Sequence, residues 1–154
     1  MKGQGATEYL VLLGVVLIVA LVAIALLGFF PGLSSDAKET QSRAYWTGTA
    51  SPFQITDFRY SGTDLTLVVR NSRTESLEIA NVTLTPGPGG TPVVWTPSSS
   101  GSVGSGNTVT LEIDNAPSCS SGDSFEMYVS FLYNTNDITG NTQRGEKALV
   151  GKCA

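Results

Sequence analysis

The feature that most constrains this chain is an uncharged apolar run from Leu10 to Phe30, which directly follows Glu8 and Tyr9. At about 1.5 Å of rise per residue, a helix of this length spans roughly 30 Å, the thickness of the hydrocarbon core of a bilayer. A carboxylate at the edge of such a segment is unusual, because an ionised side chain in hydrocarbon costs several kcal/mol and normally has a function. The run therefore predicts a membrane-spanning helix with a functional acid at its entrance.

The residues that flank the run bear on where the chain is processed. Pro31 and Gly32 follow it, and the small-residue cleavage pattern of an ordinary secretory signal does not appear there. The alternative cut lies upstream, between Gly3 and Gln4, and it would leave the apolar helix at the start of the mature chain. Before that cut, Lys2 helps to hold the N-terminus in the cytoplasm, so we expect the rest of the chain to lie outside.

The first residues resemble the class III signal peptide of archaeal type IV pilins, over residues 2–10 (KGQGATEYL). In that family a short basic leader ends in Gly, a Gln opens the mature protein, and a Glu followed by an aromatic residue comes five and six residues into it. Gly3, Gln4, Glu8 and Tyr9 occupy those places. The resemblance implies a leader cut between Gly3 and Gln4, and a role in assembly for Glu8 and Tyr9.

The same resemblance implies what the chain does and with what. It implies a structural subunit of a type IV pilus-like surface filament, a homo-oligomer with bundled N-terminal helices in its core, with adhesion as a role. It also implies three partners, namely a prepilin peptidase, an assembly ATPase and a membrane platform. The precursor would be a membrane protein, and the assembled product an extracellular filament.

The charges at the helix entrance fit this interpretation on physical grounds. A cut after Gly3 would expose an amino group on Gln4 about one helical turn from Glu8. Two opposite charges at the mouth of an apolar helix can satisfy each other, within one subunit or between neighbours. The alternative is a membrane-tethered monomer that presents an extracellular β-sandwich as an adhesin or binding module. That alternative leaves the Gly3-Gln4 junction and the spacing of Glu8 unexplained.

Pro31-Gly32 predicts that the long helix is kinked or broken at this point. Proline removes a backbone donor and clashes with the preceding turn, and glycine adds backbone freedom. We expect residues 1–3 to be a leader peptide, 4–46 the hydrophobic assembly helix, and 47–154 a globular head.

A second helical segment is predicted from Leu33 to Trp46. Ser35 or Asp36 is a candidate N-cap for it. Glu39 and Arg43 are four residues apart, the spacing at which opposite charges pair on one helix face.

From Pro52 onward the hydrophobic period changes to two, the period of half-buried strands. The alternating runs are 53–55, 57–60, 65–69, 77–79, 82–84, 93–95, 109–113, 125–131 and 148–150. Turn-forming residues separate these runs, and the Gly/Ser-rich stretch 98–107 is interpreted as a surface loop. Seven or eight short strands at this spacing predict an antiparallel β-sandwich. The fold class is therefore α+β, a long N-terminal helix followed by a sandwich.

The two cysteines, Cys119 and Cys153, are most simply a disulfide if the head is extracellular. It would fasten the end of the chain to the loop before the strand at 125–131 and contribute about 3 to 4 kcal/mol of stability. Two free thiols in a reducing compartment are the alternative. Two cysteines without a histidine make a poor metal site, and no metal or cofactor is expected.

Composition argues against catalysis and nucleic-acid binding. The sequence has no histidine, which excludes Ser/His/Asp and Cys/His nucleophiles, so we expect no enzyme activity. It has 9 basic and 13 acidic residues, scattered along the chain, and so lacks the basic footprint of a nucleic-acid partner.

Two polar motifs remain. Asn81 opens an Asn-Val-Thr glycosylation acceptor sequence, which predicts a candidate glycan site. Asn134, Asn136 and Asp137 make an oxygen-rich loop, but their spacing matches no defined calcium loop, and such residues are common in turns for backbone reasons.

Overall fold

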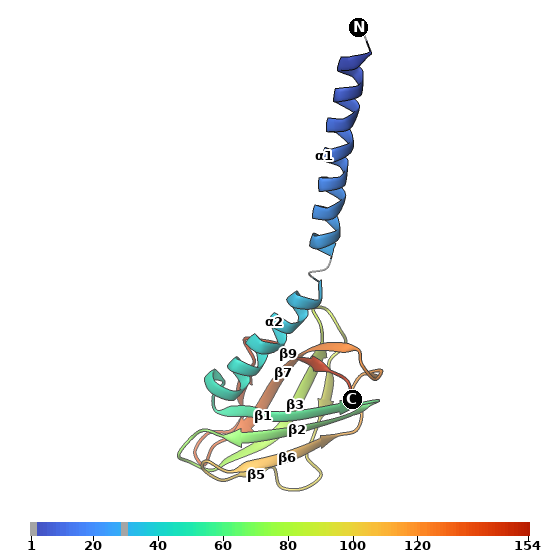
Figure 1. The fold of residues 1–154 in the computed structure, drawn as a ribbon. Coiled ribbons are helices and arrows are strands. Elements are labelled where there is room, and N and C mark those ends of the chain that lie inside the picture. Colours follow the sequence, from blue (N-terminus) through green and yellow to red (C-terminus); the bar gives the residue numbers. More distant parts are fainter. Residues whose placement is uncertain (1–2, 29–30) are drawn as a thin grey trace. The chain divides into compact units, whose positions relative to one another are not determined.

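The computed structural model describes residues 3–28 and 31–154 (Figure 1). Its elements are α1 (Gln4–Gly28), α2 (Pro31–Ala44), the π-helical turn η1 (Tyr45–Thr49), β1 (Phe53–Ser61), β2 (Asp64–Asn71), β3 (Leu77–Pro86), β4 (Val93–Trp95), β5 (Ser102–Val103), β6 (Thr108–Ile113), β7 (Ser124–Asn134), β8 (Asn141–Arg144) and β9 (Leu149–Lys152). The predicted α+β class is confirmed. The chain divides into two compact units at the boundary between Ala37 and Lys38.

The nine strands form two antiparallel sheets in the described part of the head (Figure 1). One sheet has the order β1-β2-β6, so β6 forms one of its edges. The other has the order β4-β3-β7-β8, and β5 adds to β3 while β9 adds to β7. The central strands β3 and β7 of the second sheet pair from Glu78 with Asn134 to Pro86 with Met127.

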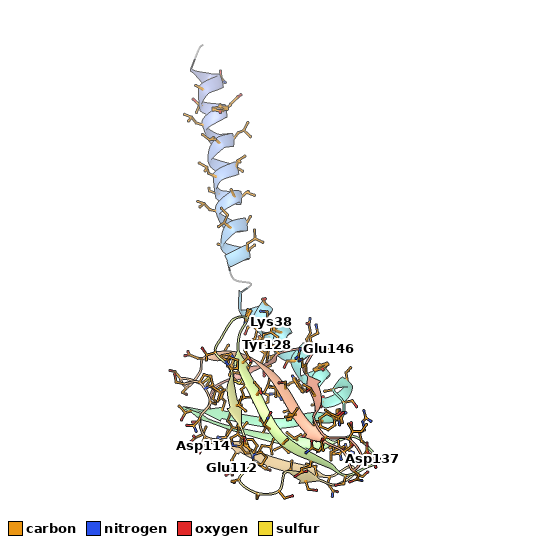
Figure 2. The ribbon with its side chains drawn as sticks, turned by 180° about the vertical axis from the view of Figure 1, so that it is seen from behind. Lys38, Glu112, Asp114, Tyr128, Asp137 and Glu146 are labelled. Atoms are coloured by element: carbon orange, nitrogen blue, oxygen red, sulfur yellow. A yellow bond between two sulfur atoms is a disulfide. The ribbon has the colours of Figure 1, made fainter. Side chains whose placement is uncertain are left out.

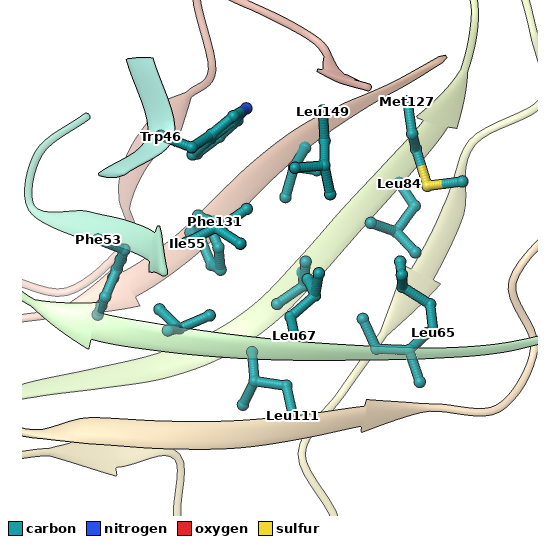
Figure 3. Packing of buried hydrophobic residues seen from close by; sticks show 14 of the residues in the cluster. Trp46, Phe53, Ile55, Leu65, Leu67, Leu84, Leu111, Met127, Phe131 and Leu149 are labelled. Atoms are coloured by element: carbon teal, nitrogen blue, oxygen red, sulfur yellow. The ribbon is translucent and has the colours of Figure 1, made fainter. Parts of the chain in front are cut away.

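The core lies between the two sheets (Figure 3). Along β2 the buried residues alternate with more exposed ones, as expected for a strand with one face on a core. Leu65, Leu67 and Val69 of that strand are fully buried, and they join Leu84 of β3 and Phe131 of β7 in one apolar cluster. Burial of this shared face is the main stabilising term for a sandwich of this size.

Two strands are longer than the sequence pattern predicts, because each absorbs an irregularity. The register of β1 shifts between Ile55 and Asp57, and that of β3 shifts between Ile79 and Asn81. A bulge of this kind interrupts the alternation of apolar residues without ending the strand. Four predicted alternating runs therefore merge into two strands.

Two further strands were not predicted. The short β5 lies inside the Gly/Ser-rich stretch that the sequence assigns to a loop, and β8 lies in a stretch assigned to a turn. Neither segment has an alternating apolar pattern. The sole buried side chain of β8, in the sequence Asn-Thr-Gln-Arg, is Gln143, which is 6% exposed. The observed number of strands in the described head is nine, not seven or eight.

Two buried amides tie the strands together through hydrogen bonds to the backbone of neighbouring segments. Gln143 accepts a hydrogen bond from the backbone N–H of Phe53 at 2.8 Å and donates one to its carbonyl at 2.8 Å, so β8 is linked to the opposite sheet. Asn71 is 0% exposed and donates to the carbonyls of Glu75 and Val103 at 2.8 and 2.9 Å. Its side-chain oxygen accepts from the N–H of Arg73 at 2.9 Å.

The N-terminal region contains two helices, and the two residues between them lie outside the described part of the chain. The first helix ends at Gly28 and the second begins at Pro31, a position where the missing N–H of proline is tolerated. The predicted cap is wrong, because Ser35 and Asp36 lie inside α2. The predicted pair on α2 is confirmed, with Arg43 at 3.3 Å from Glu39.

Candidate assembly helix and its anchorage in the head

The helix α1 is apolar around its whole circumference. Within the described residues, one helix is long and apolar enough to cross a membrane. It spans Gln4–Leu27, which is 24 residues. None of its side chains is buried, and the large apolar ones range from 44% exposed at Leu13 to 70% at Leu27. A helix that is apolar on all sides is stable only inside lipid or inside a bundle of other helices. The chain thus combines a long apolar N-terminal helix with a β-sheet domain. This is a pilin-like architecture.

Of the residues that the sequence predicts to matter, Gln4, Glu8 and Tyr9 lie in the first turns of this helix. Gly3 immediately precedes α1, and its carbonyl accepts the hydroxyl of Thr7 at 2.8 Å. Gln4 is the first helical residue, so the junction between Gly3 and Gln4 falls at the helix start. The predicted cut would therefore leave the rest of α1 intact.

Glu8 and Tyr9 are exposed on α1, and Tyr9 is 66% exposed. Glu8 makes no hydrogen bond or ion pair with any other residue of 3–28 or 31–154. Glu8 carries the first charge of the described part of this helix, so any partner lies outside the described residues: in residues 1–2, in solvent, at the terminal amine of a processed chain, or on another molecule. The charge pairing predicted from the sequence stays a prediction.

The C-terminal half of α2 is attached to the head by polar contacts at its last two turns. The hydroxyl of Ser42, which is 2% exposed, accepts the N–H of Val150 in β9 at 2.9 Å. Lys38 lies 3.5 Å from the carboxylate of Glu126 in β7, and both belong to the same compact unit. Arg43 lies over the ring of Phe58, 5.6 Å from its centroid.

The turn η1 then inserts a tryptophan into the core. Trp46 is 1% exposed and meets Phe131 of β7 edge-on, with centroids 6.5 Å apart. Gly145 lies against its ring, and a side chain at that position would collide with it. Tyr45, the neighbour of Trp46, accepts the N–H of Glu146 on its hydroxyl at 3.0 Å. This anchorage is not predicted from the sequence, although an apolar pair that directly follows a polar helix is a signal for it.

The predicted disulfide between Cys119 and Cys153 is present, with 6.0 Å between the two Cα atoms. It fastens the last strand region to the end of the hairpin between β1 and β2, because Cys119 bridges to Gly62. Backbone bonds support the link, since Cys153 donates to Asp123 at 2.8 Å. A structural disulfide together with an N-terminal apolar helix indicates a membrane anchor or signal and an extracellular head.

The two polar motifs have ordinary structural surroundings. Asn81 lies in β3 opposite Leu132 and is half-buried, and its glycosylation stays a prediction. In the oxygen-rich loop, Asn134 accepts the N–H of Gly140 at 2.9 Å and Thr135 bonds to Ile138, as expected for turn residues. Among the described residues no group of three or more His, Cys, Asp or Glu side chains could hold a metal ion.

No family model matches this chain, and no curated protein is similar to it.

Proposed function

We propose that this chain is a structural subunit of an archaeal type IV pilus-like surface filament, which polymerises through α1 and displays its sandwich outside the cell. The observation that carries the proposal is a helix exposed and apolar on every side with one carboxylate near its start. A membrane span and a filament core both cover such a helix completely. The position of Glu8, five residues into the chain that a cut after Gly3 would leave, favours the filament.

The energetics of transfer from lipid to filament give Glu8 its role. Lipid chains are as apolar as leucine, so moving α1 from the bilayer into a bundle of helices releases no hydrophobic free energy. Association must then depend on close packing and on polar pairs. A carboxylate on one subunit and the amine of Gln4 on its neighbour would attract only in one register, which makes Glu8 the residue that specifies assembly.

The remaining parts of the proposal rest on the resemblance of residues 2–10 to the leader of archaeal type IV pilins. The precursor lies in the membrane, a prepilin peptidase removes residues 1–3, and an ATPase and a membrane platform drive assembly of a homo-oligomer. The sandwich forms the outer layer and serves adhesion, and the chain has no catalytic role. The disulfide between Cys119 and Cys153 suits a head that stays outside the cell.

The second candidate is a membrane-tethered monomer that presents the sandwich as an adhesin or binding module. One observation favours it, namely that a single helix of spanning length is enough for a permanent anchor. The two candidates differ in the fate of the first three residues and in the oligomeric state.

The deciding experiment combines intact-mass measurement with electron microscopy of cells that express the full chain together with a class III signal peptidase and its assembly machinery. The filament proposal expects a mature chain that begins at Gln4, and filaments that an antibody against the head decorates. A chain that keeps Met1 and stays monomeric in the membrane would overturn it and support the tether.

A further inference from the structure

A cleft opens on the head between the edges of the two sheets. One wall is formed by β4 and the segment after it, and the other by β6 and the residues after it. The volume of the cleft is about 640 Å³. Sites for small ligands usually have volumes of about 300 to 1,000 Å³. The cleft belongs wholly to the unit Lys38–Ala154, and no feature of α1 contributes to it.

One aromatic ring and many oxygens line this cleft. Trp95 is half-buried, since it packs against the core and also faces the cleft. The hydroxyls of Thr96 and Thr110, the carboxylates of Glu112 and Asp114 and the amide of Asn115 supply polar groups. In the described part of the chain, no lysine or arginine lines it. Figure 2 shows Glu112 and Asp114 close together at the end of β6, away from Asp137 and from Lys38.

The polar side chains of the cleft have no partners within the described residues. Glu112, Asp114, Asn115 and the indole N–H of Trp95 make no hydrogen bond or ion pair there. Other surface loops of the head behave differently, because the amide of Asn134 is bonded to Gly140 and the hydroxyl of Ser105 to the carbonyl of Arg73. The cleft therefore offers donors and acceptors that the fold itself does not use.

The walls of the cleft are held in place by the sheets. Trp95 pairs with Val82 of β3, and Glu112 pairs with Thr66 of β2. The segment between the walls is fixed at its far end, where the carbonyl of Gly101 accepts the N–H of Ile79 at 2.8 Å. A Cβ on Gly101 would collide with the backbone of Ile79, so only glycine allows this close approach. A site with fixed walls loses little entropy when it binds a ligand.

From this geometry we propose that the cleft binds an uncharged carbohydrate. The apolar face of a sugar ring stacks on an indole, and its hydroxyls donate to carboxylates and accept from the indole N–H and the amide. Two carboxylates in a cleft that no lysine or arginine lines disfavour phosphorylated, sulfated and acidic ligands. A metal ion is a poor occupant, because no group of three or more suitable side chains in the described residues could hold one.

This inference goes beyond the proposed filament and does not depend on it. A filament subunit and a tethered monomer would both carry the cleft. The saccharide could belong to a host or neighbouring cell surface, or to a glycan on another copy of this chain, and both present the same chemistry to the cleft.

The test uses the full chain in micelles of a polyoxyethylene detergent, since a maltoside or glucoside detergent would itself be a ligand. The chain has two tryptophans, and Trp46 is buried in the core, so it is an internal reference. Cellobiose, chitobiose and maltotriose are added to protein with ¹⁵N-labelled indoles. We expect at least one of them to shift the Trp95 indole resonance saturably while that of Trp46 stays in place.

Variants separate specific binding from general effects. The double variant Glu112→Gln with Asp114→Asn should bind that saccharide about tenfold more weakly. Trp95→Leu should abolish binding. Asp137→Asn removes an exposed carboxylate far from the cleft and should leave affinity unchanged. The double variant changes only exposed side chains, so it stays informative if Trp95→Leu fails to fold.

Digalacturonic acid, an acidic disaccharide, is the matched ligand control and should not bind. The proposal is overturned if none of the three neutral saccharides shifts Trp95 at its solubility limit, if digalacturonic acid binds as well as they do, or if Asp137→Asn weakens binding equally. A Thr-Val hexapeptide that shifts Trp95 where no saccharide does would also overturn it, and would assign the free edge of β6 to strand addition. Filaments or membranes of this chain are then prepared with and without glycans and tested with the same saccharide. Equal binding in both indicates an external glycan, and weaker binding in the glycosylated sample indicates that a glycan on a neighbouring copy already fills the cleft.

Discussion

The hydroxyl of Ser42 in α2 accepts the backbone N–H of Val150 in β9, at 2.9 Å and away from solvent. The two residues are far apart in the sequence, and their contact joins the helix that enters the head to the last strand of the chain. Among the described strands, β9 pairs with β7 alone, from Ser124 with Lys152 to Met127 with Leu149. Ser42 therefore supplies a partner that no further strand supplies.

Ser42→Ala should lower the free energy of unfolding by about 1 to 3 kcal/mol, because it leaves the buried N–H of Val150 without an acceptor. Guanidinium unfolding followed by the fluorescence of buried Trp46 measures this. Thr47→Ala is the control, since the exposed hydroxyl of Thr47 bonds only to Arg43 in its own turn. Its effect should stay within about 0.5 kcal/mol. Equal losses in both variants would contradict the role given to Ser42.

Asn71→Ala should be among the most destabilising polar substitutions in the head. Asn71 is fully buried and satisfies the carbonyls of Glu75 and Val103 and the N–H of Arg73. Each buried group that loses its partner costs about 1 to 3 kcal/mol, so we expect a loss of about 3 kcal/mol or more. Asn134→Ala, which removes a half-buried amide at the end of β7, should cost less than about 1 kcal/mol by the same unfolding measurement. Similar values for both would be incompatible with this network.

The sequence predicts those parts of this fold that rest on periodic apolar burial. The strands at Leu65 and Phe131 follow the alternation of the chain, the apolar helix follows from hydropathy, and the start of a second helix at Pro31 fits the backbone preference of proline. The disulfide follows from the count of cysteines. In β8 the one buried side chain is the amide of Gln143, which bonds to the backbone of Phe53. A strand that is held in this way has no pattern of apolar residues by which the sequence could reveal it.

The candidate sites divide in the same way. Glu8 is found from the sequence because a charge beside an apolar run is itself unusual. The cleft cannot be found from the sequence, because Trp95 and Glu112 are far apart in it. They line the same cleft only because β4 and β6 are edges of different sheets. The bulge before Asn81 likewise depends on pairing with β7, which a single strand does not encode.

Removal of the disulfide should destabilise the head by about 3 to 4 kcal/mol, as expected for a link that spans 34 residues. The double variant Cys119→Ala with Cys153→Ala measures this by denaturant unfolding. The wild type in a reducing agent should match it, and the reducing agent should leave the variant itself unchanged. An unfolding midpoint that does not move on reduction would show that backbone pairing alone holds the end of the chain.

Stability should fall at alkaline pH through Tyr60. Burial raises the pKa of the Tyr60 phenol above its ordinary value of 10.0, and this phenol donates to the carbonyl of Pro117. A raised pKa means that the folded state holds the proton more tightly, so the contribution is fully present below pH 10.0 and is lost as the pH rises through the folded-state value.

Tyr60→Phe isolates this effect. Below pH 10.0 the variant should be less stable than the wild type by about 1 to 2 kcal/mol, because the carbonyl of Pro117 loses its donor. The difference should shrink as the pH rises further, and unfolding of both proteins across this range checks it. A difference that is constant with pH would exclude Tyr60 as the titrating group.

Glu8→Ala should separate processing from assembly. We expect the leader to be cut, because the junction between Gly3 and Gln4 is unchanged, and filaments to be reduced about tenfold or more, since even about 1.4 kcal/mol per contact changes association by that factor. Intact mass and filament counts in micrographs measure the two steps. Asp137→Asn is the control and should assemble normally. Normal filaments from Glu8→Ala would contradict the pairing role of this carboxylate.

The cross-link between Cys119 and Cys153 also limits how far one molecule can lengthen under tension. When a chain is pulled from α2 and from its last residue, the load passes through the sulfur bridge and bypasses the intervening stretch. At about 3.4 Å per residue, a bypass of 34 residues keeps each stretched molecule roughly 110 Å shorter than its reduced counterpart. A head that is loaded between these two points would therefore keep this limit even after its sheets had opened.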